Sequence, residues 1–241
     1  METLNNYTVG SLVASNFKAA SVFQKFGIDF CCRGNMTIEE ACKAKNIDAE
    51  QVEKEVFAVI NSGEQASVDY NSWPIDLLAD YIEKTHHRYV IERIPELNLF
   101  LSKICRVHGE RHPELFDIYK HFVASSEELT MHMKKEENVL FPYIRSMVES
   151  VRQQREIDQP HFRTIQNPIA MMMEDHEVEG DRFREISKLS NGYNPPVDAC
   201  TTYRVAFQML QDYERDLHTH IHLENNILFP KAVEFEQTMS N

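Results

Sequence analysis

The chain has 241 residues and a formal net charge of −13, which excludes two classes of partner. Nucleic acids and anionic membranes both select proteins with a basic face, so we expect neither as a partner. The sequence contains no run near the ~20 apolar residues that a membrane-spanning helix needs. Its N-terminus also lacks the basic start and apolar core of an export signal. Five cysteines cannot all pair within one chain, which argues against a disulfide framework. These features predict a cytosolic protein.

Glycine is scarce and strong helix formers are plentiful, so the composition predicts an all-α protein. Residues 1–61 are expected to form a small domain of short helices. Residues 62–73 are polar and rich in turn formers, which is typical of a linker. Residues 74–241 then form a second, larger domain.

The small domain combines helix-start signals with a pair of adjacent cysteines. Thr37 and Glu40 have the spacing of a capping box, and Asp48 is a second candidate N-cap. Cys31 and Cys32 lie in a glycine-bracketed loop and cannot easily bridge each other with ordinary disulfide geometry. The residues alone favour one buried thiol beside one partly exposed thiol. The alternative is a thiol pair that receives or passes on iron or electrons.

Four long helical segments are expected in the larger domain, separated by polar or proline-rich stretches. Four helices of this length predict an antiparallel four-helix bundle. A polar insert at about residues 149–167 separates the second helix from the third. The expected helices span about residues 74–107, 113–149, 168–189 and 198–236.

The larger domain contains one eleven-residue pattern twice. The segment His132–Pro142 returns 88 positions later as His220–Pro230. In each copy a histidine and a glutamate stand four residues apart, so on a helix both leave the same face. A further histidine precedes the two copies by 45 and 44 residues. Each terminal proline should kink its helix or open a carbonyl one turn back. We interpret six residues as one metal constellation with approximate two-fold symmetry: His87, His132, Glu136, His176, His220 and Glu224.

A lone histidine on a helix is more often a core or surface residue than a ligand, but a repeated set on four helices favours metal binding. The internal spacing selects His87 over its neighbour His86. His108 follows His87 by 21 residues, or roughly 30 Å along one straight helix. Only a chain reversal near Pro95 would bring it to the same centre, so it is left out. His222 should face away from the site.

Two further carboxylates lie on the same helical stripes as the ligands. Glu128 stands four residues before His132, and Asp216 stands four residues before His220. They fit outer partners or proton carriers of the metal site. Surface salt bridging explains them equally well.

Imidazole and carboxylate ligands without thiolate indicate iron, manganese or zinc. Two carboxylates on opposite helices can each bridge two metals, which leaves places for a bridging oxygen and an exogenous ligand. We therefore expect two non-haem iron ions, oxo- and carboxylate-bridged. Such a pair can cycle between ferrous and ferric states and bind O2 or NO.

The chain resembles the bacterial iron–sulfur cluster repair proteins known as RIC, for repair of iron centres, and residues 74–236 resemble a hemerythrin-like di-iron bundle. The resemblance implies a stress-induced cytosolic protein that supports recovery of damaged iron–sulfur clusters, with the six residues above as ligands. Its partners would be damaged iron–sulfur proteins or a cluster-assembly scaffold. The insert at residues 149–167 departs from the family pattern. The motifs that carry the resemblance are Asp29–Cys32, His132–Pro142, Glu174–Glu177, Ala199–Thr202 and His220–Pro230.

Three functions remain open at this point. The leading hypothesis is a protein that supplies iron, or removes NO, so that clusters damaged by nitrosative or oxidative stress can be rebuilt. The second is an NO reductase that forms N2O at the di-iron pair, with the adjacent cysteines relaying electrons. The third is a hemerythrin-like O2 or NO sensor or carrier. The sequence decides neither whether the protein is an enzyme nor whether it forms a homodimer.

Overall fold

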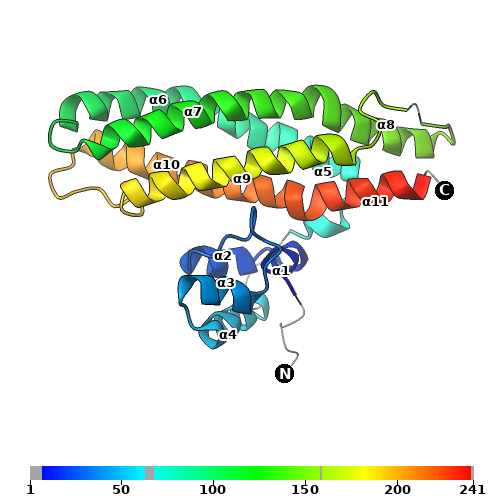
Figure 1. Ribbon diagram of the computed structural model, residues 1–241, viewed down its shortest axis with the longest axis horizontal. Helices are drawn as coiled ribbons and strands as arrows, with labels where there is room; N and C mark the ends of the chain where they lie inside the picture. The colour runs from blue at the N-terminus through cyan, green and yellow to red at the C-terminus, as the bar shows by residue number, and fades with distance from the viewer. Residues whose placement is uncertain (1–6, 63–67, 158, 240–241) are drawn as a thin grey trace. The chain divides into compact units, whose positions relative to one another are not determined.

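The computed structural model describes residues 7–62, 68–157 and 159–239, and it is all-α, as the composition predicts (Figure 1). In this part of the chain the only β feature is an isolated antiparallel bridge between Thr8 and Thr37. The chain divides into two compact units. We call residues 1–78 with 219–241 the terminal unit, and residues 79–218 the central unit. The expected domain limits at 61 and 74 stay a prediction, and residues 63–67 of the expected linker lie outside the described residues.

The terminal unit contains short helices whose starts are capped as the sequence predicts. The Thr37 hydroxyl accepts the Glu40 N–H at 3.2 Å, and the Glu40 carboxylate accepts the Thr37 N–H at 2.9 Å. The Asp48 carboxylate accepts the Glu50 N–H at 3.0 Å. The start of α5 and the last turn of α10 also belong to this unit. Its other elements are α1 (Val9–Ser15), α2 (Ala19–Lys25), α3 (Ile38–Lys45), α4 (Ala49–Ile60), the 3₁₀-helix η2 (Tyr70–Ser72), the π-helix η5 (Glu224–Leu228) and α11 (Phe229–Met239).

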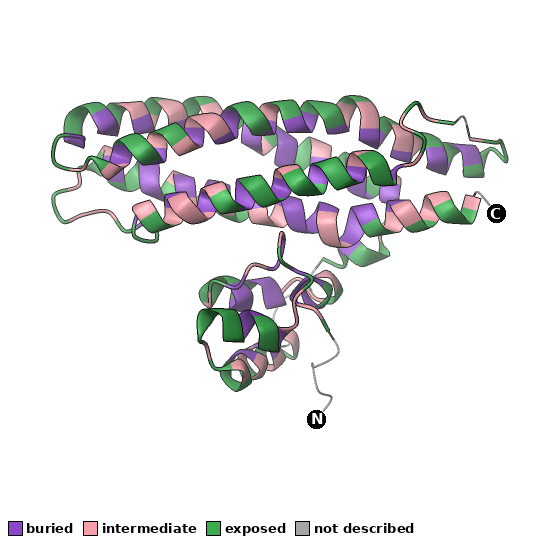
Figure 2. Ribbon diagram, viewed as in Figure 1, coloured by how far each residue is buried: buried purple, intermediate pink, exposed green. Residues whose placement is uncertain are grey.

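The central unit is a four-helix bundle built from α6, α7, α9 and α10, which lie side by side in Figure 1. The ring of Tyr213 on α10 joins all four helices. Its centroid lies 6.4 Å from Tyr89 on α6, 5.5 Å from Phe122 on α7 and 5.6 Å from Phe183 on α9. Buried residues line the inward faces of the helices (Figure 2). The elements are α5 (Ile75–Tyr81), η3 (Ile82–His87), α6 (Arg88–His108), α7 (Glu114–Lys135), η4 (Glu136–Leu140), α8 (Phe141–Arg152), α9 (Gln166–Leu189) and α10 (Thr201–Leu223).

The connections of the central unit follow the turn signals of the sequence. Helix α9 ends at Leu189, and Gly192 then adopts a φ of +67°, a conformation that favours glycine. The polar insert expected at residues 149–167 begins within the last turn of α8, which ends at Arg152. Its Phe162 ring packs edge-on against Tyr143 of α8 at 5.1 Å. Among the described residues, none of the helices has the length and apolar character needed to span a membrane.

Both copies of the repeat contain a π-helical turn that begins at the glutamate. The Phe141 N–H bonds the Glu136 carbonyl, and the Phe229 N–H bonds the Glu224 carbonyl, each five residues back. A proline follows immediately in both copies. Because proline lacks an N–H, the regular bonding pattern cannot continue through it. The helix therefore widens by one residue in front of each proline, at the place where an opened carbonyl was expected.

Candidate metal centre

The central unit holds four of the six predicted ligands in its buried interior. His87 ends η3, His132 lies in the last turn of α7, Glu136 begins η4 and His176 lies on α9. Their exposed fractions are 2% or less. The Oε2 atom of Glu136 lies 3.4 Å from Nε2 of His87 and 3.3 Å from Nε2 of His132. The Nε2 atoms of His132 and His176 are 3.0 Å apart. One carboxylate oxygen thus lies close to two imidazoles.

The terminal unit holds the other predicted pair, His220 and Glu224. Nε2 of His220 lies 3.0 Å from Oε1 of Glu224, and both side chains are buried. The same pairing occurs between His132 and Glu136 in the first copy. The repeat therefore produces two equivalent His–Glu pairs, each one helical turn long.

Carboxylates outside the ligand set orient two of the imidazoles. Nδ1 of His87 lies 2.8 Å from Glu137, and Nδ1 of His132 lies 3.2 Å from Asp175. A carboxylate on Nδ1 leaves Nε2 to face a metal, which is the usual arrangement of a metal-binding histidine. The hydrogen bond with His132 lowers the pKa of Asp175 to about 2, and Lys135 contributes to the same shift. Sequence reasoning missed both carboxylates, although each stands directly beside a predicted ligand in the chain.

The two carboxylates nominated from the sequence have other partners. Glu128 is half exposed and forms an ion pair with Arg182 at 2.6 Å. This agrees with the interpretation of Glu128 as a surface salt-bridge residue. Asp216 lies 2.9 Å from Nδ1 of His86. His86 is buried like its neighbour His87. Its ring contacts Asp216 and packs against the ring of Tyr81, whose centroid lies 5.5 Å away.

His108 has a partner outside the predicted ligand set, and its exclusion from the metal site stays a prediction. Helix α6 runs from Arg88 to His108 with Pro95 inside it, so the chain does not reverse. Nε2 of His108 instead lies 3.2 Å from the sulfur of Cys200.

The two adjacent cysteines of the terminal unit share one carboxylate. Oδ1 of Asp29 accepts the N–H groups of Cys31 at 3.0 Å and Cys32 at 2.9 Å. The two sulfurs are 3.7 Å apart, with Cys31 buried and Cys32 half-buried. Burial, followed by the proximity of Cys32 and Asp29, raises the pKa of Cys31. Ligand atoms of the three residues also lie within 4.8 Å of one another, so the group is a candidate for holding a metal ion. The thiol relay stays a prediction.

The cysteine loop packs against the second copy of the repeat. Nδ2 of Asn226 donates to the carbonyls of Phe30 at 3.3 Å and Cys31 at 3.4 Å, and Asn225 reaches the Cys31 carbonyl at 3.5 Å. His222 is buried beside the same loop, 5.5 Å from the Phe30 ring, and burial lowers its pKa to about 4. The residue after the predicted ligand Glu224 thus contacts the backbone of Cys31. We call these contacts around Asn226 the loop joint.

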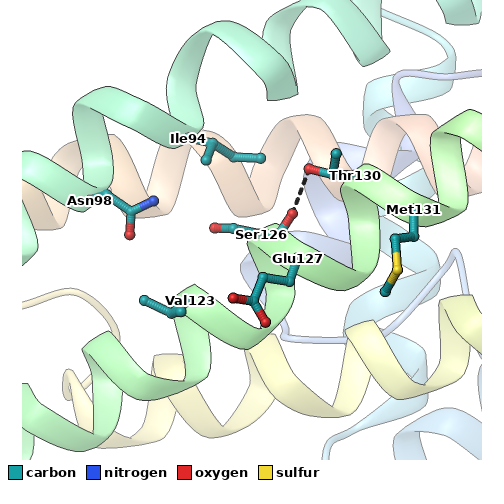
Figure 3. Close-up of a pocket in the computed structure, with 7 residues that line it drawn as sticks. All are labelled: Ile94, Asn98, Val123, Ser126, Glu127, Thr130 and Met131. Atoms are coloured by element: carbon teal, nitrogen blue, oxygen red, sulfur yellow. Dashed lines mark hydrogen bonds between the residues drawn. The ribbon is translucent and has the colours of Figure 1, made fainter.

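A separate shallow depression lies on the central unit between α6 and α7 (Figure 3). Its lining contains none of the predicted ligands. The lining residues are Ile94, Asn98, Val123, Ser126, Glu127, Thr130 and Met131.

A helical bundle with buried histidine–glutamate sets defines a cation-binding protein. Residues 79–232 match the hemerythrin HHE cation binding domain, and residues 5–59 match the ScdA N-terminal domain, a domain of unknown function. The chain belongs to the family of iron–sulfur cluster repair proteins, as the sequence motifs predicted.

Three relatives illustrate the match. The iron–sulfur cluster repair protein ScdA of Staphylococcus haemolyticus is 31% identical over 227 residues, covering 94% of this chain and 98% of the relative. The repair protein YtfE of Yersinia pseudotuberculosis is 32% identical over 231 residues, covering 96% and 98%. YtfE of Escherichia coli is 32% identical over 225 residues, covering 93% and 96%. The similarity therefore extends through both the cysteine loop and the repeat.

Proposed function

We propose that this chain is a cytosolic di-iron protein that repairs iron–sulfur clusters damaged by nitrosative or oxidative stress, by donating iron, removing NO or both. The observation that carries the proposal is the buried set around Glu136, in which one carboxylate meets two histidines on different elements. It occurs in a chain whose relatives are named iron–sulfur cluster repair proteins. The partners would be damaged iron–sulfur proteins or a cluster-assembly scaffold.

The proposed centre comprises the six ligands that the sequence predicts. The hemerythrin HHE match covers residues 79–232 and so includes both copies of the repeat. Both copies have the same His–Glu pair and the same π-turn, which supports equivalent roles for Glu136 and Glu224 as bridges. The six proposed ligands are His87, His132, Glu136, His176, His220 and Glu224.

The donor set fits iron. Imidazole nitrogens and carboxylate oxygens suit iron and disfavour copper(I) or an iron–sulfur cluster, both of which select thiolates. Glu137 and Asp175 hold Nδ1 of His87 and His132, so that Nε2 of each is directed to the same Glu136 oxygen. Burial of these ligands excludes bulk water. When bound, an iron pair would supply ferrous–ferric redox chemistry and affinity for O2 and NO.

We infer that the cysteine loop passes iron or electrons between this centre and a client. The support is local to the terminal unit, where Asn225 follows the ligand Glu224 and donates to the carbonyl of Cys31. A thiolate is a good transient iron ligand, whereas buried imidazoles and carboxylates retain iron.

Metal analysis tests the centre. Protein reconstituted anaerobically should hold two irons per chain and show the absorption of an oxo-bridged diferric pair. A single metal per chain, or a preference for zinc, would overturn the dinuclear assignment. Single-turnover reactions of the reduced protein with NO, with N2O and released iron both measured, separate iron donation from NO removal.

A double substitution tests the relay. Cys31→Ser with Cys32→Ser should keep the diferric spectrum but fail to restore an NO-damaged iron–sulfur enzyme. Cys42→Ser, which alters a buried thiol of α3 outside the loop, is the matched control and should repair normally. Full repair by the double-serine protein would leave the loop cysteines with a structural role.

A further inference from the structure

A thiol and an imidazole meet at the end of the bundle farthest along α6 from His87. His108 is the last residue of α6, and Cys200 directly precedes α10. Nε2 of His108 lies 3.2 Å from the sulfur of Cys200. The histidine is 5% exposed, whereas the cysteine is exposed. The 21 residues between His87 and His108 correspond to roughly 30 Å of helix, so this pair is separate from the ligand set.

The His108 ring is held in place with one nitrogen directed at the thiol. It packs 5.4 Å from the ring of Tyr203 and 6.5 Å from that of His112. Its Nδ1 is buried and has no hydrogen-bond partner among the described residues. Among the described residues, the imidazole therefore makes its hydrogen bond with the thiol of Cys200, through Nε2. A neutral imidazole nitrogen at this distance can accept the proton of a thiol.

The surrounding charges also suit a thiolate at Cys200. Its carbonyl accepts the Arg204 N–H at 3.1 Å, so the cysteine occupies the N-cap of the 23-residue helix α10. Helix N-termini favour a negative charge. Two carboxylates at this cluster disfavour a thiolate: Asp198, two residues before Cys200, and Glu114, whose Oε1 lies 3.2 Å from Nδ1 of His112. Asp198 has partners of its own. Arg111 at 2.8 Å and Nε2 of His112 at 3.0 Å compensate it.

The other thiols are less suited to reaction with a solution reagent. Burial raises the pKa of Cys42 and brings that of Cys105 to about 11. Cys31 is buried with a raised pKa, and Cys32 is half-buried. Cys200 is the exposed one of the five cysteines.

We propose that Cys200 is a site of S-thiolation by low-molecular-weight disulfides, with His108 as the base that takes its proton. In this exchange the Cys200 proton moves to Nε2 of His108, and the thiolate attacks one sulfur of the disulfide. A new disulfide bond forms at Cys200 while the bond within the reagent breaks. The leaving thiolate takes up a proton from His108 or water, so the cysteine sulfur is oxidised and one sulfur of the reagent disulfide is reduced to a thiol.

The test uses the iron-loaded, full-length protein and dithiobis(nitrobenzoic acid), a disulfide whose released thiol is coloured. The fastest phase should map to Cys200 by peptide mass spectrometry and disappear in Cys200→Ser. His108→Gln should slow this phase about 5-fold at pH 6 and less than about 2-fold at pH 9. An imidazole in contact with the thiol matters most where hydroxide is scarce, and at high pH hydroxide can take the thiol proton in its place.

His112→Gln is the matched control, because His112 contacts Asp198 and not the thiol, and it should change the rate less than about 2-fold. A fastest phase at another cysteine, or an unchanged rate at pH 6 in His108→Gln, overturns the proposal. If His108→Gln loses helicity or iron, the wild-type protein decides the question. Its ratio of rates at pH 6 and pH 9 should exceed that of glutathione, and an equal ratio overturns the proposal.

Discussion

Replacing Gly10 with alanine should disrupt the loop joint of the terminal unit. Gly10 lies in the first turn of α1, and its N–H bonds the Gly34 carbonyl at 2.7 Å. A Cβ at position 10 would lie 2.3 Å from Oδ1 of Asn226 and 3.0 Å from the Gly34 carbonyl. The first distance is too short for any contact. Either Asn226 must move, or α1 must shift away from η5.

The magnitude follows from two opposing effects. Alanine is favoured over glycine within a helix by roughly 0.5–1 kcal/mol. Overpacking costs about 1–3 kcal/mol, and moving Asn226 would break its hydrogen bonds to the Phe30 and Cys31 carbonyls. We therefore expect Gly10→Ala to lower the free energy of unfolding by about 1–2 kcal/mol.

A double-mutant cycle measured by urea unfolding tests this reasoning, with all proteins at the same iron loading. Asn226→Ala alone should cost about 1–2 kcal/mol, because it removes the same hydrogen bonds. In the Asn226→Ala background, Gly10→Ala should cost almost nothing, so the coupling should be about 1–2 kcal/mol. Pulsed alkylation should also show faster labelling of Cys31 in Gly10→Ala. Additive effects within about 0.5 kcal/mol would refute a direct clash with Asn226.

Three further predictions concern the central unit. Asp175→Asn should weaken iron retention about 10–100-fold in a chelator competition, because His132 loses its carboxylate partner, and unchanged retention would show that this contact does not support the metal. Burial raises the pKa of Glu214 from 4.5 to about 7 in the folded protein. As the pH rises from 4.5 to 7, the unfolded chain loses this proton before the folded protein does, which favours unfolding. The free energy of unfolding should therefore fall by up to about 3 kcal/mol over this range. Glu214→Gln should escape this loss in urea unfolding at pH 5 and pH 8, and parallel pH profiles would contradict the shift. His87→Ala should abolish binding of two irons while His108→Ala retains them, as measured by iron per chain, and equal losses would contradict the separation along α6.

The all-α fold and the His–Glu pairs could be predicted because both depend on spacing along a single helix. His132 and Glu136 stand four residues apart, and any α-helix brings such residues to one face. The capping box at Thr37 is equally local. Local rules therefore predicted the helix starts and both pairs.

Contacts between helices could not be predicted in this way. Helical spacing offered Glu128 as an outer partner of the metal site or as a surface salt bridge, but the carboxylate that contacts His132 is Asp175 of α9. Which helix faces His132 depends on packing, and the residue pattern of α7 does not contain that information. The loop joint was missed for the same reason, because Asn226 looks like an ordinary polar residue until the cysteine loop packs on it.

The π-turns confine a change in chain length to one turn of each helix. A π-turn contains one residue more than the regular helix would place there, and the Phe141 N–H accordingly bonds the carbonyl five residues back. Loss of one residue between Glu136 and Phe141 would convert this bond to a regular one, with Phe141 still one turn after Glu136. The buried Phe141 and Ile144 would keep their direction into the interior. In a regular part of the helix, the same deletion would rotate every later residue by about 100°. The stretch between the glutamate and the phenylalanine is therefore where the repeat tolerates a change in length with the least disturbance of helix packing.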